Sequence, residues 1–248
     1  MIITSITPGI IIKDGVLKIC FRNTLINDKI IFFITIFKTT KCHNQNNKEN
    51  YLYLFISLFY MNHLVIDIET VPLEIKDEDI KEYLMDKKID KESRSLHPLY
   101  SKIICIVIKG DEETVLIGEE KDILERFWSI AKEYSRFVTH NGYGFDIPFI
   151  IVRSAINNVN FHSKIWLNKY SMIGSNHFDT MLFFSQNGVF FNVRLDIIAR
   201  SLGIETSDDI SGRDVERLYK EGNINKIIEH CRKDVQITEK IYLFLKDG

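Results

Sequence analysis

The hydrophobic positions of the chain follow regular spacings from residue 61 onward. Short apolar runs rich in Ile and Val lie at 63–68, 102–110, 114–117 and 137–139, and runs of this length predict buried strands. The first strand is expected to end at the Thr-Val-Pro sequence 70–72, because proline interrupts strand pairing. A Gly-Asp turn separates the second run from the third and predicts a hairpin. The sequence therefore predicts several strands that belong to one sheet.

Apolar positions three and four residues apart predict helices between and after these strands. The clearest are 121–134, 146–156 and the long amphipathic segment 223–246. The charged stretch 73–101 is expected to hold one exposed helix and a mobile excursion. Shorter helices are predicted at 178–185, 195–202 and 211–220. An α/β fold, with a mixed sheet flanked by helices, is the consistent outcome.

Residues 1–60 differ from the rest of the chain in pattern and charge. Bursts rich in Phe, Ile and Tyr alternate with the Asn- and Lys-rich segment 41–50, and no helical or strand period is sustained. Seven Lys and Arg stand against three Asp and Glu, whereas residues 61–248 hold 25 basic and 31 acidic residues. We interpret 1–60 as an atypical N-terminal extension, an over-extended gene model with Met61 as the true start. A β-rich appendage or partner-binding arm is the alternative.

The composition is that of an ordinary globular protein. The 248 residues are 45% hydrophobic and 27% charged with a net charge of −2, which excludes disordered and collagen-like chains and argues against bulk electrostatic coating of nucleic acid. No apolar stretch approaches the roughly 18–20 residues that cross a bilayer, so no membrane partner is expected. The four cysteines form no C-x-x-C pair and no signal-peptide layout precedes them, so we expect a reducing, cytoplasmic location.

Carboxylates stand at three places where a fold does not ordinarily need them. Asp67 and Glu69 alternate on a predicted strand and therefore face the same side, where two negative charges call for a cation. Asp146 starts a predicted helix, and His230 and Asp234 are four residues apart on one helix face. Taken singly, each has a simpler explanation: a solvated strand end, a helix cap and a surface pair.

The segment before Asp146 strengthens the case for a ligand. In N-G-Y-G-F-D, the glycines permit close backbone approach, Asn141 offers an amide and Phe145 supplies a planar apolar face. A bound nucleotide would use all three.

Three ordered motifs then resemble a known family. These are LVIDIET at 64–70, THNGYGFDIPFI at 139–150 and EHCRKDVQITEKIY at 229–242. They resemble the DEDD superfamily of proofreading-type 3'-5' exonucleases, specifically proteins related to the exonuclease domain of family B DNA polymerases. The resemblance covers residues 62–246 and implies an RNase H-like fold with the active site at the strand ends.

Carried over residue by residue, the four family carboxylates fall on Asp67, Glu69, Asp146 and Asp234. The resemblance implies that they hold two divalent metal ions, Mg²⁺ or Mn²⁺, because hard oxygen ligands suit these ions and two-metal sites support phosphodiester hydrolysis. It also implies a division of roles, with Asp67 bridging both ions, Glu69 and Asp234 on the ion that activates water, and Asp146 supporting the second.

In such a site, the terminal nucleotide would be contacted by three further residues: Thr70, Asn141 and Phe145. Position 230 departs from the family pattern. The tyrosine subtype places a Tyr four residues before the final Asp, and here that position is His230; the histidine subtype would place its His where this chain has Glu229. We hypothesise that His230 acts as a general base, since imidazole accepts a proton near neutral pH. The alternative is that it only packs beside the metals.

Other candidates favour structural roles. Asp179, next to His177, is expected to cap the following helix. The aromatics Phe183, Phe184, Phe190 and Phe191 are assigned to core packing rather than to base stacking. For the basic set, phosphate contact and solvated surface remain equal alternatives; its members are Arg194, Arg200, Arg213, Arg217 and Lys220.

The resemblance predicts a metal-dependent 3'-5' exonuclease acting on single-stranded DNA or a frayed DNA 3' end, with a polymerase or repair protein as a partner and a role in DNA repair or proofreading. Two alternatives stay open: a ribonuclease trimming short RNA, because metal-phosphate chemistry does not distinguish the sugars, and a non-catalytic nucleic-acid-binding module of the same fold. The oligomeric state is not predicted.

Overall fold

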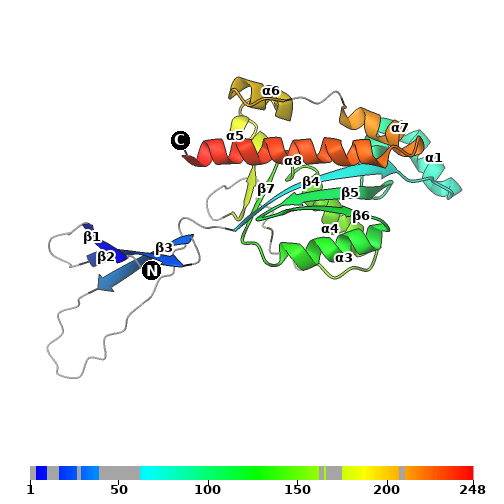
Figure 1. Cartoon of the computed structure of the whole chain (residues 1–248). Coiled ribbons are helices and arrows are strands. Elements are labelled where there is room, and N and C mark those ends of the chain that lie inside the picture. The colour runs from blue at the N-terminus through cyan, green and yellow to red at the C-terminus, as the bar shows by residue number, and fades with distance from the viewer. Residues whose placement is uncertain are drawn as a thin grey trace. The chain divides into compact units, whose positions relative to one another are not determined.

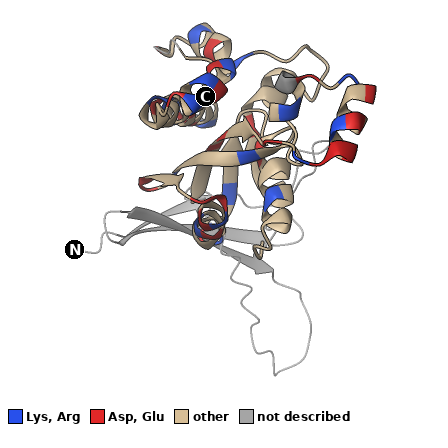
Figure 2. Cartoon of the chain, turned by 90° about the vertical axis from the view of Figure 1, so that its right-hand side faces the viewer, with Lys and Arg blue, Asp and Glu red and all other residues tan. Residues whose placement is uncertain are grey.

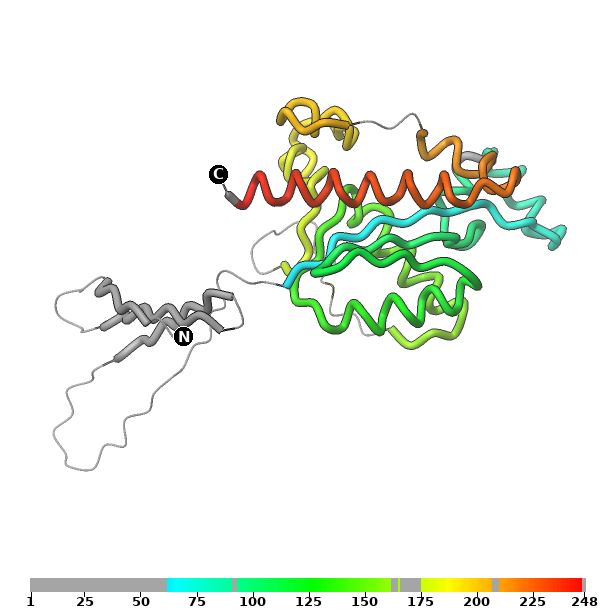
Figure 3. The backbone as a smooth tube through the Cα atoms, in the orientation of Figure 1, coloured from blue at the N-terminus to red at the C-terminus, as the bar shows by residue number. Residues whose placement is uncertain are grey.

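The computed structural model divides the chain into two compact units, Met1–Met61 and Asn62–Gly248. It describes the backbone at 4–9, 17–26, 29–38, 62–161, 165, 175–206 and 210–247 (Figure 1). Figure 3 colours the described backbone of the second unit from cyan to red. Each unit is described by itself.

The first unit holds a small antiparallel sheet. Its order is β1 (Thr4–Gly9), β2 (Leu17–Ile26) and β3 (Lys29–Lys38), with β2 in the middle. Regular strands here differ from the expectation that 1–60 lack strand periodicity. Runs of β-branched and aromatic residues, such as Ile30–Phe37, favour strands even without alternation. The segment 39–60 lies outside the described residues, and the interpretation of 1–60 as a gene-model extension stays a prediction.

The second unit is built on a five-stranded mixed sheet of order β6-β5-β4-β7-β8. The central strand β4 (His63–Pro72) pairs antiparallel with β5 (Ser101–Lys109) and parallel with β7 (Arg136–Thr139). The outer strands are β6 (Glu113–Ile117), antiparallel to β5, and β8 (His177–Asp179), parallel to β7. The expected mixed sheet is therefore confirmed. Strand β4 runs through the Thr-Val-Pro sequence expected to end it, with an irregularity between Glu69 and Thr70.

Helices cover both faces of this sheet, as Figure 1 shows: α3 (Glu120–Ala131) and α4 (Asp146–Ile156) on one face and the long α8 (Ile224–Asp247) on the other. The alternation of β4 decides which residues face which helix. Leu64, Ile66 and Ile68 pack into the core with α3 and α4, whereas Val65 packs with α8. By the same alternation, Asp67 and Glu69 belong to the face that α8 covers.

The remaining helices are short. The charged stretch after β4 forms α1 (Glu78–Asp86), capped by Asp77, and α2 (Lys91–Ser95), where one helix was expected. After β8 follow α5 (Thr180–Phe184), α6 (Leu195–Ser201), the 3₁₀ turn η1 (Gly212–Asp214) and α7 (Val215–Lys220). Strand β8 was not predicted, because three residues are too few to show a period. None of the helices in the described ranges is long and apolar enough to cross a membrane.

Charged side chains are spread over the second unit. In the cartoon of Figure 2, both basic and acidic positions occur along the helices of the second unit.

Candidate active site

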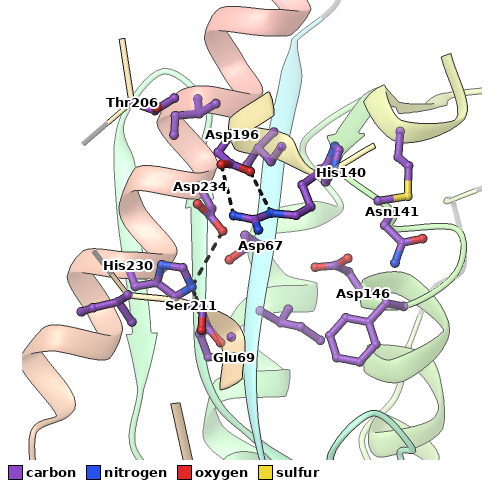
Figure 4. Close-up of a pocket in the computed structure, with 18 of the residues that line it drawn as sticks. Asp67, Glu69, His140, Asn141, Asp146, Asp196, Thr206, Ser211, His230 and Asp234 are labelled. Atoms are coloured by element: carbon purple, nitrogen blue, oxygen red, sulfur yellow. Dashed lines mark hydrogen bonds and ion pairs between the residues drawn. The ribbon is translucent and has the colours of Figure 1, made fainter. Parts of the chain in front are cut away.

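A pocket of about 600 Å³ opens in the second unit and gathers carboxylates from four elements (Figure 4). Its lining includes Asp67 and Glu69 from β4, Asp146 from the start of α4, and His230 and Asp234 from α8. Residues that lie up to 167 positions apart in the chain thus converge on one cavity. The structure brings together every residue of the predicted acidic constellation.

The relative lengths of two strands explain why Asp146 reaches this place. Strand β4 pairs with β7 only from His63 to Val65, so the edge of β4 beyond Val65 has no strand partner on that side. The chain leaves β7 and enters α4 there, and the Asp146 carboxyl accepts a backbone hydrogen bond from Ile68. Asp146 is the first residue of α4, after an N-cap at Phe145 that makes no side-chain cap bond. Its carboxyl is therefore aimed at the pocket rather than used as the N-cap of α4.

The loop before α4 is held by a buried carboxylate. Asp179 accepts hydrogen bonds from the backbone N–H groups of Asn141 (2.9 Å) and Tyr143 (3.0 Å). The Gly142 N–H donates to the hydroxyl of Thr139 (3.1 Å), and a Cβ at Gly142 would lie 2.2 Å from that oxygen. Only glycine fits there.

The Asp179 carboxylate both caps α5 and holds the loop before α4. It caps α5 as predicted, accepting from the N–H groups of Met181 and Leu182. The hydrogen bonds from the loop to Asp179 were not predicted. The loop and Asp179 are 36 or more residues apart in the chain, and no local sequence pattern indicates such a pairing.

Burial dominates the electrostatics of the acid cluster. It raises the pKa of Asp67 well above its usual value, and the charges of Asp146, Asp234 and Glu69 raise it further. Burial also raises the pKa of Asp146, to about 8, against the lowering effect of its backbone hydrogen bonds. Carboxyls in this state resist ionisation on their own, and a bound cation would stabilise the ionised form.

The thiol of Cys231 lies beside this cluster. One ligand atom each of Asp67, Glu69 and Cys231 falls within 4.8 Å of the others. The Cys231 thiol is fully buried, which raises its pKa, and it donates to the backbone carbonyl of Asp67 (3.5 Å). A protonated thiol is a poor ligand for a hard cation, so the carboxylate oxygens are the better candidates. The sequence pattern marked Cys231 only as an apolar helix position.

His230 reaches the acids despite being shorter than tyrosine. Its Nε2 atom lies 3.6 Å from Oε1 of Glu69 and 4.0 Å from Oδ2 of Asp234 (Figure 4). The residue is 7% exposed. One turn of α8 separates His230 from Asp234, so both side chains point to the same side of the helix.

The three expected nucleotide contacts are placed differently. Asn141 and Phe145 line the pocket. Asn141 adopts a left-handed backbone conformation (φ 65°), which asparagine tolerates better than most residues. Thr70 is not part of the pocket lining: its hydroxyl donates to the backbone carbonyl of Ser95 (2.9 Å). The structure therefore does not bring Thr70 to the other site residues.

A second histidine lines the pocket. His140 follows β7, and one ring nitrogen lies 2.8 Å from the hydroxyl of Thr180. Burial lowers the pKa of His140 to about 4, so its ring is neutral at pH 7.

The structure separates the basic residues that the sequence left undecided. Arg194 and Arg200 line the pocket together with Asp196, which accepts hydrogen bonds from both. By contrast, Arg217 on α7 pairs with Asp214 (3.2 Å) and Glu221 (3.1 Å) at the surface. Lys220 likewise pairs with its helix neighbour Glu216. Only part of the basic set is thus in reach of the acid cluster.

The four phenylalanines that the sequence assigned to core packing differ in their exposure. Phe183 and Phe184 are half-buried and in contact with each other, as expected for packing. Phe190 and Phe191 are 61% and 84% exposed, so the assignment of these two to the core is wrong. They lie in a loop whose short apolar run looks like core in the sequence but is exposed in the structure.

Known proteins resemble this chain in structure and in sequence. The structure of the family B DNA polymerase from the hyperthermophilic archaeon Pyrobaculum calidifontis matches with a TM-score of 0.55 at 18% identity, over 74% of this chain and 24% of the polymerase. This likeness defines the fold as the RNase H-like α/β fold of a polymerase exonuclease domain, as expected from the sequence.

A family model, "Predicted 3'-5' exonuclease related to the exonuclease domain of PolB", matches residues 102–246. The chain belongs to this family. The match includes Asp146, His230 and Asp234, whereas Asp67 and Glu69 precede it and join the site through the fold.

Two relatives match this chain in sequence. The uncharacterized protein MJ0365 of Methanocaldococcus jannaschii is 28% identical over 170 residues, 64% of this chain and 94% of that protein. DNA polymerase 1 of Sulfolobus acidocaldarius is 26% identical over 149 residues, 55% of this chain. The aligned part is only 16% of that polymerase, so the chain spans a small fraction of the polymerases it matches.

Proposed function

We propose that this protein is a metal-dependent 3'-5' exonuclease that hydrolyses phosphodiester bonds at the 3' end of single-stranded or frayed DNA. One observation carries the proposal: in a chain of this exonuclease family, the carboxylates of Asp67, Glu69, Asp146 and Asp234 line one pocket. The resemblance had named these residues from motifs alone, and their convergence supports the assignment.

The acid cluster suits two divalent ions. Asp146 is buried and Asp67 half-buried, and the raised pKa values of both carboxyls support a site whose negative charge calls for a cation. Carboxylate oxygens are the ligands that Mg²⁺ and Mn²⁺ prefer. Asp67, Glu69, Asp146 and Asp234 would hold the ions. When bound, these ions would supply an activated water and stabilise the leaving oxyanion.

The protein's own groups position the reactants. His230 lies among the acids, where its imidazole would accept a proton from the attacking water. Asn141 and Phe145 would hold the terminal nucleotide, by its polar edge and its flat face. Asp179 holds the loop that carries Asn141, so the contacts to substrate are set before binding.

The choice of DNA follows from the polymerase relatives, and a polymerase or repair protein is the partner that this relationship favours. Trimming of short RNA is the competing activity, because the same chemistry acts on either sugar. Comparison of matched DNA and RNA oligonucleotides separates the two: faster DNA shortening supports the proposal, and equal rates contradict the preference for DNA.

The test is shortening of a 5'-labelled single-stranded oligonucleotide by the full chain with Mg²⁺ or Mn²⁺. We expect a ladder that grows from the 3' end, is abolished by EDTA and is lost in Asp146→Ala. Asp111→Ala, which removes an exposed carboxylate in the turn between β5 and β6, is the matched control and should cut normally. A folded protein that binds the oligonucleotide and never shortens it would instead support a non-catalytic binding module.

A further inference from the structure

An exposed apolar tip stands between α5 and α6. Its residues Val189, Phe190 and Phe191 are 75%, 61% and 84% exposed. Adjacent large apolar side chains in water are unfavourable, and clusters of them commonly mark binding surfaces. We call these residues the apolar tip.

The backbone that presents the apolar tip is ordered by hydrogen bonds and held in an uncommon conformation. Gln186, Asn187 and Gly188 all have positive φ, at 49°, 56° and 88°. Left-handed conformations cost free energy in residues other than glycine, so something must hold them. The carbonyl of Ser185, at the end of α5, accepts from the N–H groups of Gly188 (3.1 Å) and Phe190 (2.9 Å). The tip is therefore anchored to the end of a helix.

Two arginines of the pocket lining follow the apolar tip in the chain. Arg194 follows Phe191 by three residues, which limits their Cα separation to about 11 Å. Arg194 and Arg200 line the pocket, and Asp196 accepts from Nε (3.0 Å) and Nη2 (3.1 Å) of Arg194 and from Nη2 of Arg200. Their side chains are 80% and 59% exposed, so the guanidinium groups are oriented by Asp196 and still open to a ligand.

We propose that the apolar tip and these arginines form the path along which a single nucleic-acid strand enters the pocket. This inference rests on the proposed function and adds the route that its unpaired strand takes: bases stack on Phe190 and Phe191, and Arg194 and Arg200 bind phosphates. Aromatic faces followed by cations are what a single strand requires, since it offers flat bases and a charged backbone together. Duplex DNA hides its base faces and gains nothing from the apolar tip.

Binding of a 5'-fluorescein-labelled single-stranded oligonucleotide tests the proposal. The protein is the full chain in an Asp146→Asn background with Mg²⁺, so that the substrate is not consumed. We expect Phe190→Ala/Phe191→Ala to weaken binding about tenfold or more. Phe244→Ala, at a 53% exposed position of α8 outside the pocket lining, is the matched control and should bind normally. Because the substituted side chains are exposed, the thermal midpoint should not change.

An oligonucleotide with abasic sites isolates the stacking. It keeps the phosphates and lacks the bases, so the double variant and its parent should bind it equally. The salt dependence of binding tests the arginines. The logarithm of the association constant falls as the logarithm of the salt concentration rises, and Arg200→Ala should make this slope shallower by about 0.7 for one lost phosphate contact. Arg217→Ala, which removes a surface arginine of α7, should leave that slope unchanged.

Three results would overturn the entry path. They are normal binding by the double variant, equal weakening on normal and abasic strands, and a dimer of the parent protein that the double variant abolishes while binding is retained. The first and third leave the exonuclease proposal standing if the wild-type chain still shortens DNA. A wild-type chain that neither binds nor shortens single strands removes both proposals together.

Discussion

The Nε2 atom of His230 lies 3.6 Å from Oε1 of Glu69, although the two residues are 161 positions apart in the chain. Glu69 comes from the central strand and His230 from the C-terminal helix that covers it. The contact places an imidazole ring beside the acids proposed to hold metal.

We therefore predict that His230→Ala lowers kcat by about 10² or more, because positioned general bases contribute 10²–10⁴. Steady-state shortening of a labelled oligonucleotide measures this, with circular dichroism to check the fold. His230→Tyr restores the group that the tyrosine subtype carries at this spacing and should recover part of the rate. Unchanged turnover in His230→Ala would assign the residue to packing alone.

The raised pKa of Asp146 leads us to predict an unusual pH dependence of stability in the absence of metal. Its folded-state pKa of about 8 lies above the ordinary value of 3.8, so the native state binds the extra proton between these pH values. The free energy of unfolding therefore falls as pH rises through this window, by up to about 1.4 kcal/mol per pH unit. Asp67, whose pKa is also raised, acts in the same direction.

Chemical denaturation in EDTA at pH 6.5 and 8.0 measures this slope. Asp146→Asn should flatten it, making the variant more stable than wild type at pH 8.0 while abolishing activity. Adding Mg²⁺ should stabilise the wild type more than the variant, because metal binding is linked to folding. Identical slopes in the two proteins would show that Asp146 ionises normally.

Asp179 is predicted to matter for stability and activity together. Asp179→Ala leaves the loop N–H groups of Asn141 and Tyr143 without their acceptor and removes the cap of α5. We expect a loss of at least about 2 kcal/mol and a reduced kcat. Thermal unfolding and oligonucleotide shortening give the two readouts. The control Asp77→Ala removes the exposed cap of α1, a single bond to Ile80, and should cost about 1 kcal/mol with normal kcat.

The ion pair between Arg153 and Glu120 is predicted to affect stability alone. It joins α4 to α3 with side chains only 6% and 9% exposed, and Glu120 also accepts from the backbone of Ile103 (2.8 Å). Glu120→Ala would leave a buried guanidinium uncompensated, at a cost of about 3–5 kcal/mol. Urea denaturation measures it. Glu125→Ala, which breaks an exposed pair with Lys121, should cost less than about 1 kcal/mol.

Sequence patterns predicted the helices whose hydrophobic periodicity extends over many residues or whose ends carry a clear signal. Helix α4 begins at Asp146 and ends at Ile156 as expected, and the long terminal helix is within a few residues of its predicted range. Strand β8 was missed because three residues carry no period. Phe190 and Phe191 of the apolar tip were wrongly assigned to the core, because hydrophobicity alone does not say whether a packing partner is within reach.

The amino-acid sequence by itself determined which carboxylates belong together, since Asp67, Glu69, Asp146 and Asp234 stand in ordered motifs. Only the tertiary structure decided that they share a pocket with His230, that Thr70 turns away to Ser95, and that Asp179 holds the loop. The physical reason is that motifs record residue types along the chain, whereas contacts across 36 or more residues depend on where strands end and how helices cross them.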